Sequence, residues 1–126
     1  MEQSKWYQGN VEHGFQNGRK FGFPTANIVD IQPDSKIGTG IYAVLVKMGE
    51  KEYCGMMYVG TRPTLSLSIF SVEIHILDFD GDLYGQEVFF SIMAKIREEQ
   101  QFASVDELMI QLQEDEHVIR QFFRQR

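Results

Sequence analysis

The 126-residue chain contains one cysteine and three prolines, and it has no long apolar run. Because Cys54 is alone, no disulfide can form within the chain and a cysteine-rich zinc site is excluded. No segment approaches the ~18 consecutive apolar residues that predict a transmembrane helix. The first ten residues, MEQSKWYQGN, lack the apolar core of a signal peptide. We therefore expect a reduced, cytoplasmic protein with no membrane partner.

Positive charge is also scarce. The chain has 12 Lys and Arg residues against 18 Asp and Glu residues, a net charge of −6. This balance disfavours a broad basic face, so we expect no nucleic-acid partner, although a phosphate can still bind locally. The apolar share of 43% is typical of a globular protein, and the length favours a single domain over residues 1–126.

Short runs rich in β-branched and aromatic residues occupy most of the first hundred positions, with turn residues between them. Such runs predict strands. The turns at Gly49–Glu50 and Asp80–Gly81 predict hairpins, the second being the strongest hairpin signal in the chain. Residues 60–66 are expected to form a loop. Strands are expected at 5–12, 23–29, 40–48, 52–59, 69–79 and 84–96. Five or six strands without an intervening helix predict an antiparallel barrel or sandwich.

After residue 100 the apolar residues recur at intervals of three and four. Ser104 and Glu107 match a capping box, which marks a helix start. The residues that then form one apolar stripe are Val105, Leu108, Met109, Leu112, Ile119, Phe122 and Phe123. This pattern predicts a helix at about 105–123 whose stripe packs on the barrel. A stripe that binds a partner is the alternative.

Two adjacent segments carry candidate ligand-binding groups. The loop 14–22 combines three glycines with Arg19 and Lys20, so backbone N–H groups and side-chain charge can contact a phosphate. The loop lacks the Walker A spacing, and a loop without a ligand is the alternative. Thr25 and Asn27 project to the same side of an extended chain and offer two neutral oxygen ligands for nucleotide-bound Mg²⁺. A turn in which both side chains bond local backbone is equally compatible with the spacing.

The strand expected at 69–79 has an unusual distribution of polar residues. Glu73 and His75 lie opposite an aliphatic row, but Leu77 and Phe79 continue their own face. A carboxylate on a partly covered face is a candidate general base. An exposed Glu–His pair on a surface strand is the alternative.

These motifs together resemble the riboflavin kinase (flavokinase) family, and the resemblance extends from about Gly9 to Phe123. The segment 14–28 is similar to the family's glycine loop and its Gly-Phe-Pro-Thr-Ala-Asn-Ile signature. Three further segments are similar to family motifs: 60–64 to the G-x-x-PT loop, 72–85 to the Glu-x-His hairpin, and the tail containing Ile96–Arg97, Phe102, Leu108 and Asp115.

The resemblance implies a mainly β fold, a six-stranded antiparallel Greek-key barrel over about 5–97 followed by a C-terminal α-helix. It implies transfer of the γ-phosphate of ATP to the ribityl 5′-hydroxyl of riboflavin, which gives FMN, with Mg²⁺ bound as Mg·ATP. Because the His-x-Gly-His adenylyltransferase signature is absent, a further adenylyltransferase domain or a separate enzyme would act on FMN. Two alternatives are a flavin- or nucleotide-binding barrel without turnover and an interaction module.

The resemblance also implies a role for individual residues. Glu73 would be the base that accepts the proton of the 5′-hydroxyl. Thr25 and Asn27 would bind magnesium and phosphate, and Gly14 and Arg19 would lie in the ATP-binding loop. Arg97 and Phe102 would help to form the flavin pocket.

Overall fold

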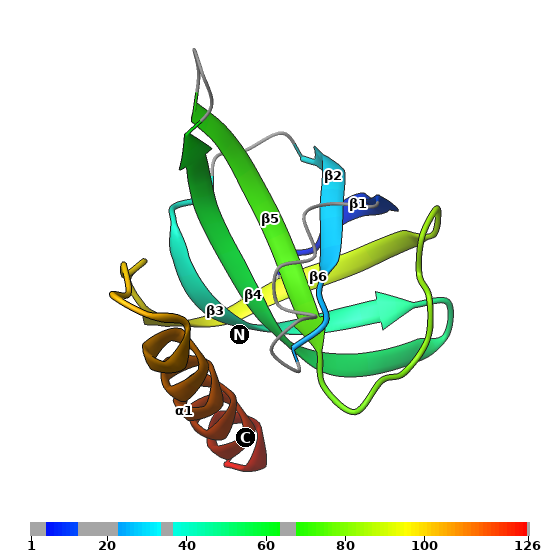
Figure 1. The fold of residues 1–126 in the computed structure, drawn as a ribbon. Coiled ribbons are helices and arrows are strands. Elements are labelled where there is room, and N and C mark those ends of the chain that lie inside the picture. Colours follow the sequence, from blue (N-terminus) through cyan, green and yellow to red (C-terminus); the bar gives the residue numbers. More distant parts are fainter. Residues whose placement is uncertain (1–4, 13–22, 34–36, 64–67, 126) are drawn as a thin grey trace.

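Six strands and one helix make up the computed structural model, which describes residues 5–12, 23–33, 37–63 and 68–125. The elements are β1 (Tyr7–Glu12), β2 (Ala26–Gln32), β3 (Gly40–Met48), β4 (Lys51–Pro63), β5 (Ser68–Ile76), β6 (Glu87–Arg97) and α1 (Val105–Arg124). The strands close into an antiparallel barrel in the order β1-β2-β5-β4-β3-β6, and α1 lies on its outer surface (Figure 1). The predicted six-stranded antiparallel barrel with a C-terminal helix is therefore confirmed.

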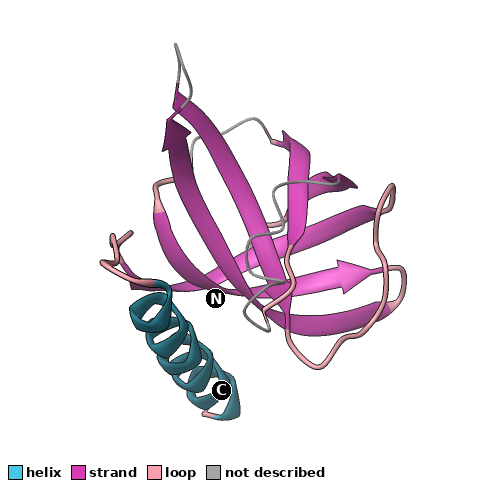
Figure 2. Ribbon diagram, viewed as in Figure 1, coloured by secondary structure: helices cyan, strands magenta, loops and turns pink. Residues whose placement is uncertain are grey.

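The connection between β5 and β6 differs from the prediction. The two strands are not neighbours, since β5 lies between β2 and β4 while β6 lies between β1 and β3. The predicted hairpin at Asp80–Gly81 is therefore wrong, and the strands expected at 69–79 and 84–96 are shorter at this connection. Asp78 has a φ of 58°, a left-handed conformation that ends the extended strand. The connection is a long loop without regular structure (Figure 2).

This long loop accounts for the order of the strands. The consecutive strands β3, β4 and β5 pair in sequence, and β6 returns through residues 77–86 to pair with β3. That arrangement is a Greek key. The loop is tied to β1, because the Gly85 N–H donates to the Val11 carbonyl at 2.8 Å and the Val11 N–H donates to the Gln86 carbonyl at 2.9 Å. The turn residues of this segment thus form a loop that runs from β5 to β1 instead of a tight turn.

The β4–β5 pair also extends further than the sequence predicted. Residues 60–66 were expected to form a loop, but the ladder continues through Gly60↔Ser71 and Thr61↔Phe70 to Pro63. Proline is compatible with the end of a ladder, where a missing N–H costs little. The strand expected at 52–59 is therefore too short.

Two apolar clusters hold the fold together. The first fills the barrel and includes the fully buried side chains of Val44, Val46, Met57, Val59 and Phe90. The second lies between the outer surface of the barrel and α1, where Ile119 packs with Ile41, Ala43 and Met56, and Leu112, Phe122 and Phe123 are partly buried against it. The predicted packing of the helix stripe on the barrel is confirmed, although Val105 at its start is exposed.

The predicted helix start is confirmed as well. Ser104 is the N-cap of α1, and its side chain accepts a hydrogen bond from the Glu107 N–H at 3.2 Å. The Glu107 carboxylate accepts from the N–H of Ala103, at 3.0 Å, one residue before the position expected in a capping box. Within the described part of the chain, no helix has the length and hydropathy needed to cross a membrane.

The position of Ile119 allows a test of the docking of α1. We expect Ile119→Ala to lower the free energy of unfolding by about 2–5 kcal/mol, because the side chain is 0% exposed between helix and barrel. The matched control on the same helix is Ile110→Ala, whose side chain is 66% exposed and which should change stability by no more than about 0.5 kcal/mol. Equilibrium urea unfolding measures both. Equal losses in the two variants would contradict this docking.

Candidate active site

Several of the residues singled out in the sequence lie on one level of the barrel. Across the strands, Asn27 of β2 pairs with Glu73 of β5, and Glu73 also pairs with Tyr58 of β4. The same level continues through Ile41 of β3 to Arg97 of β6. Directly opposed residues share a face, and the residues that alternate with them fill the interior, so this level faces outward. We call these five positions the outer row.

A hydrogen bond joins Glu73 to Thr25, the residue immediately before β2. The Thr25 hydroxyl donates to Glu73 Oε1 at 2.7 Å, between residues that are 48 positions apart in the sequence. Glu73 is only 7% exposed although it lies on the outside of the barrel. The alternatives of an exposed Glu–His pair and of a Thr25 side chain bonded to local backbone are therefore wrong.

Thr25 and Asn27 have the chemistry needed to hold a hard cation. Because its proton is directed at Glu73, Thr25 Oγ1 retains lone pairs for a further ligand. The Asn27 side chain has no hydrogen-bond partner among the described residues, and its backbone lies directly opposite Glu73. Mg²⁺ takes few protein ligands of this kind and completes its coordination with water and substrate phosphates. This donor set fits a metal that arrives with a nucleotide.

A cavity of about 510 Å³ opens beside Thr25 at one end of the barrel. Its lining combines residues of β1, β2 and β5 with the loop that connects β5 to β6, and it includes Glu12, Ile74, Phe79, Asp82 and Tyr84. Sequence reasoning missed this wall because it placed the loop residues in a hairpin. The predicted phosphate-binding residues Gly14 and Arg19 lie outside the described residues.

Tyr58 is a second member of the site that the sequence analysis missed. Its hydroxyl donates to Glu99 Oε1 at 3.2 Å. Burial raises the pKa of Tyr58, and the carboxylate of Glu99 raises it further. A Cβ at Gly60 would lie 2.7 Å from the Tyr58 ring, so the glycine makes room for the ring on the outer face. The sequence signal was a tyrosine two residues before a glycine on a strand, which is too common to identify a site.

At the far end of the outer row, Arg97 is bound by α1. Its Nε and Nη2 donate to the two carboxylate oxygens of Asp115 at 2.8 and 2.7 Å, and its Nη1 donates to the Glu98 carbonyl. The guanidinium carbon also lies 5.8 Å from the centre of the Phe102 ring. The structure thus brings Arg97 and Phe102 together, and Thr25, Asn27 and Glu73 together, at opposite ends of the row.

The Arg97–Asp115 pair is expected to be important for stability, because Asp115 is 1% exposed and an unpaired buried charge is costly. We expect Asp115→Ala to lower the free energy of unfolding by about 3–5 kcal/mol. The control is Glu98→Ala, which removes an ion pair to Lys95 on the surface and should cost no more than about 1 kcal/mol. Thermal unfolding measures both. If Asp115→Ala unfolds at the parental temperature, the pair does not anchor the helix.

Comparisons with known proteins identify the family of this chain. The riboflavin kinase family model matches residues 2–123. The bifunctional riboflavin kinase/FMN adenylyltransferase of Escherichia coli (strain K12) is 44% identical over 116 residues, which are 91% of this chain and 37% of that protein. The chain therefore spans well under half the length of this relative.

Two solved structures share the fold. A crystal structure described as a macrolide-efflux protein from Streptococcus pneumoniae has a TM-score of 0.84 and 36% identity, and the match covers 93% of this chain and 38% of that one. Riboflavin kinase from Trypanosoma brucei has a TM-score of 0.64 at 24% identity, with 98% of this chain and 83% of that chain covered, which supports the fold alone. With the family model matching nearly every residue, the chain belongs to the riboflavin kinase family.

Proposed function

We propose that this chain transfers the γ-phosphate of ATP to the ribityl 5′-hydroxyl of riboflavin and so produces FMN. The observation that carries the proposal is the 2.7 Å contact between Thr25 and Glu73. It joins a neutral oxygen ligand suited to a nucleotide-bound metal to a carboxylate suited to accept a proton. Phosphoryl transfer depends mainly on positioning and charge stabilisation, and these two groups would position the metal nucleotide next to the base.

Glu73 is the general base of the proposed reaction. Its Oε1 is occupied by the Thr25 hydroxyl, which leaves Oε2 for the 5′-hydroxyl of riboflavin. As the 5′-oxygen bonds to the γ-phosphorus, the bond from that phosphorus to the β,γ-bridging oxygen breaks and ADP leaves. The hydroxyl proton passes to Glu73. The low exposure of Glu73 keeps water away from the carboxylate and so favours the flavin hydroxyl as the nucleophile.

Thr25 and Asn27 are the proposed ligands of Mg²⁺, which when bound neutralises charge on the phosphates. The cavity beside Thr25 is the proposed nucleotide pocket. Glu12, Asp80 and Asp82 line it, and carboxylates suit the amino and hydroxyl donors of a nucleoside better than they suit phosphates. We therefore orient the nucleoside into the cavity and the phosphates toward Thr25.

We place the flavin at the Glu73 end of the outer row. Tyr58 follows Glu73 in the row, but Ile41, between Tyr58 and Arg97, is 1% exposed beneath α1, so the row is open to a substrate only as far as Tyr58. With the 5′-hydroxyl at Glu73, the ring system approaches Tyr58 and the segment after β6 that contains Glu99, the hydrogen-bond partner of Tyr58, and Phe102. Because the nitrogens of Arg97 are committed to Asp115 and Glu98, Arg97 would shape this pocket rather than bind the ring as a free cation.

The decisive assay incubates the protein with Mg·ATP and riboflavin and separates the flavins by chromatography. FMN formation is expected. Tight binding of riboflavin or nucleotide without FMN would favour the binding barrel, and neither binding nor turnover would favour the interaction module.

In the same assay, Glu73→Gln should lower kcat by about 10²–10⁴-fold, because the amide cannot accept the proton of the hydroxyl. The Gln oxygen can still accept the hydrogen bond from Thr25, so the fold and substrate binding should be retained. The matched control is Glu50→Gln in the exposed turn between β3 and β4, which should be silent. Parental kcat in a folded Glu73→Gln protein would contradict the base assignment.

Thr25→Val removes a hydroxyl at constant shape and should raise the KM for Mg·ATP. Loss of one hydrogen-bonding or coordinating group toward a charged ligand corresponds to a roughly ten- to hundredfold weaker affinity. Riboflavin affinity, followed by quenching of flavin fluorescence without nucleotide, should change less. Thr25→Ser is the control, because it keeps the oxygen. If Val and Ser variants have the same KM for Mg·ATP, the hydroxyl does not bind the metal nucleotide.

A further inference from the structure

His75 lies two residues beyond Glu73 on the same outward face of β5, and the proposed mechanism does not use it. Its Nδ1 lies 2.8 Å from the carbonyl oxygen of Pro24, the residue immediately before Thr25. Since a carbonyl oxygen only accepts, Nδ1 must carry the proton and donate it. The His75 ring also meets Phe23 edge to face, with the ring centres 5.4 Å apart. His75 therefore contacts the two residues that lead directly into Thr25.

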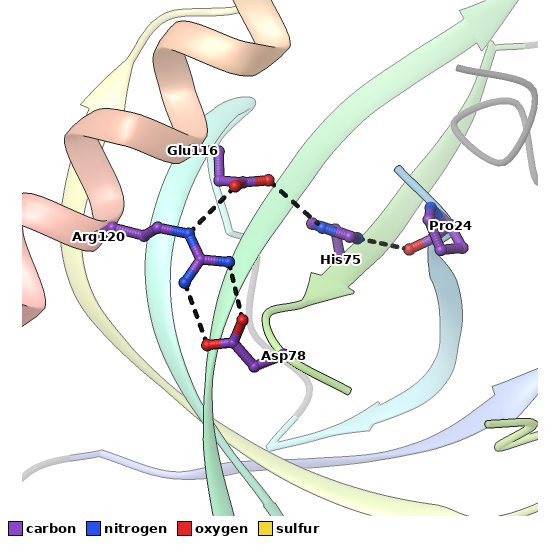
Figure 3. A network of polar contacts seen from close by, with 5 residues as sticks. All are labelled: Pro24, His75, Asp78, Glu116 and Arg120. Carbon is purple, nitrogen blue, oxygen red and sulfur yellow. Dashed lines mark hydrogen bonds and ion pairs between the residues drawn. The ribbon is translucent and has the colours of Figure 1, made fainter. Parts of the chain in front are cut away.

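The other side of the imidazole faces the helix. His75 Nε2 lies 3.8 Å from Glu116 Oε1 of α1, a separation longer than a hydrogen bond. Glu116 in turn accepts from Arg120 Nε at 3.1 Å, and Arg120 donates from both terminal nitrogens to Asp78 at 3.0 and 3.1 Å. Figure 3 shows this chain of contacts from Pro24 through His75 to the helix. The hydrogen bond to the Pro24 carbonyl orients the ring, and the Glu116 carboxylate flanks its other side.

From these contacts we infer that His75 is a positioning residue for the phosphoryl-transfer site. Two neighbouring outward positions of β5 hold two consecutive residues of the segment before β2: Glu73 holds the side chain of Thr25, and His75 holds the carbonyl of Pro24. The two hydrogen bonds together fix the position of the Thr25 backbone along β5 and the direction of its side chain toward Glu73. Glu116, held by Arg120, flanks His75, so α1 reaches the site through these side chains. The inference rests on the proposed function.

The geometry of the contact provides a matched pair of variants. The amide nitrogen of Asn can occupy the place of His Nδ1, whereas the longer Gln side chain carries its amide to the place of Nε2. His75→Asn therefore keeps a donor for the Pro24 carbonyl, and His75→Gln loses it. A misplacement of about 1 Å at a reacting group can cost on the order of 10² in rate, so kcat/KM for Mg·ATP should fall about ten- to hundredfold in the Gln variant. The Asn variant should stay close to the parent.

Two readouts separate positioning from a general effect on stability. Mg·ATP affinity, measured by calorimetry below the unfolding transition, should weaken in His75→Gln and stay near parental in His75→Asn. Riboflavin affinity in the free enzyme should be parental in both. Equal kinetics and equal nucleotide affinity in Gln, Asn and parental proteins would overturn the inference, as would equal losses in both variants.

A second test acts from the helix. Glu116→Ala should weaken Mg·ATP binding in the same direction as His75→Gln but by a smaller factor, because the bond to Pro24 remains. Glu114→Ala, an exposed position on the same helix, should leave it unchanged. Identical nucleotide affinities for the two helix variants would rule out the proposed route through α1. Absence of FMN formation by the parental protein would contradict the proposed function, whereas the calorimetric comparison still decides the role of His75.

Discussion

Closure of the six strands into a barrel is the constraint on which the rest of the structure depends. A closed barrel of this size has an interior that apolar side chains fill completely, so it has no room for a reaction inside. Every second residue of a strand must then face outward. Chemical groups on the strands, Glu73 above all, therefore lie on the outside and depend on other segments to shield them from water.

Two segments provide that shielding. The stretch Phe23–Thr25 lies against β5 on one side, through the hydrogen bonds of Thr25 to Glu73 and of His75 to Pro24. The helix α1 covers the neighbouring face through the apolar cluster around Ile119. A carboxylate on an outer strand face thereby reaches a low exposed fraction without being placed in the core. The candidate site therefore depends on the two segments that cover the barrel, Phe23–Thr25 and α1.

The ion pairs of α1 differ in what they contribute. Asp115 is buried, and its two hydrogen bonds with Arg97 offset the desolvation penalty of the carboxylate and tie α1 to β6. Asp78 is exposed at the end of β5, where Arg120 lowers the pKa of its carboxyl mainly by hydrogen bonding, and such a pair contributes little net stability. Apolar burial therefore drives the docking of α1, while the ion pairs of Arg97 and Arg120 favour one position of the helix along the barrel. That distinction matters for His75, whose ring needs Glu116 at a defined position.

Much of the fold followed from local patterns. The strand at 40–48 and the turn at Gly49–Glu50 are as predicted, because β-branched residues and a tight turn act over a few residues. The hairpin predicted at Asp80–Gly81 is wrong because the same turn residues belong to a loop whose end is hydrogen-bonded to β1. That contact joins residues more than seventy positions apart in the sequence and leaves no local pattern. For the proposed site, spacing and polarity marked Thr25, Asn27 and Glu73 as candidates, and the resemblance to the family supplied their expected roles. The contact between Thr25 and Glu73, and the positions of Tyr58 and His75 beside them, depend on the register between strands. No single segment of the sequence encodes that register.

The loop between β5 and β6 also affects how this acidic chain could bind the phosphates of a nucleotide. With a net charge of −6, the molecule as a whole repels phosphates, so any attraction must be local. The crossing loop adds Asp80 and Asp82 to a cavity wall that already contains Glu12, and a short turn between β5 and β6 would have left that wall unbuilt. The carboxylates of Glu12, Asp80 and Asp82 are exposed at this cavity, while Thr25 offers a neutral oxygen ligand beside it. In the proposed function, this distribution of charge favours a nucleotide whose phosphates point toward Thr25 and away from the three carboxylates.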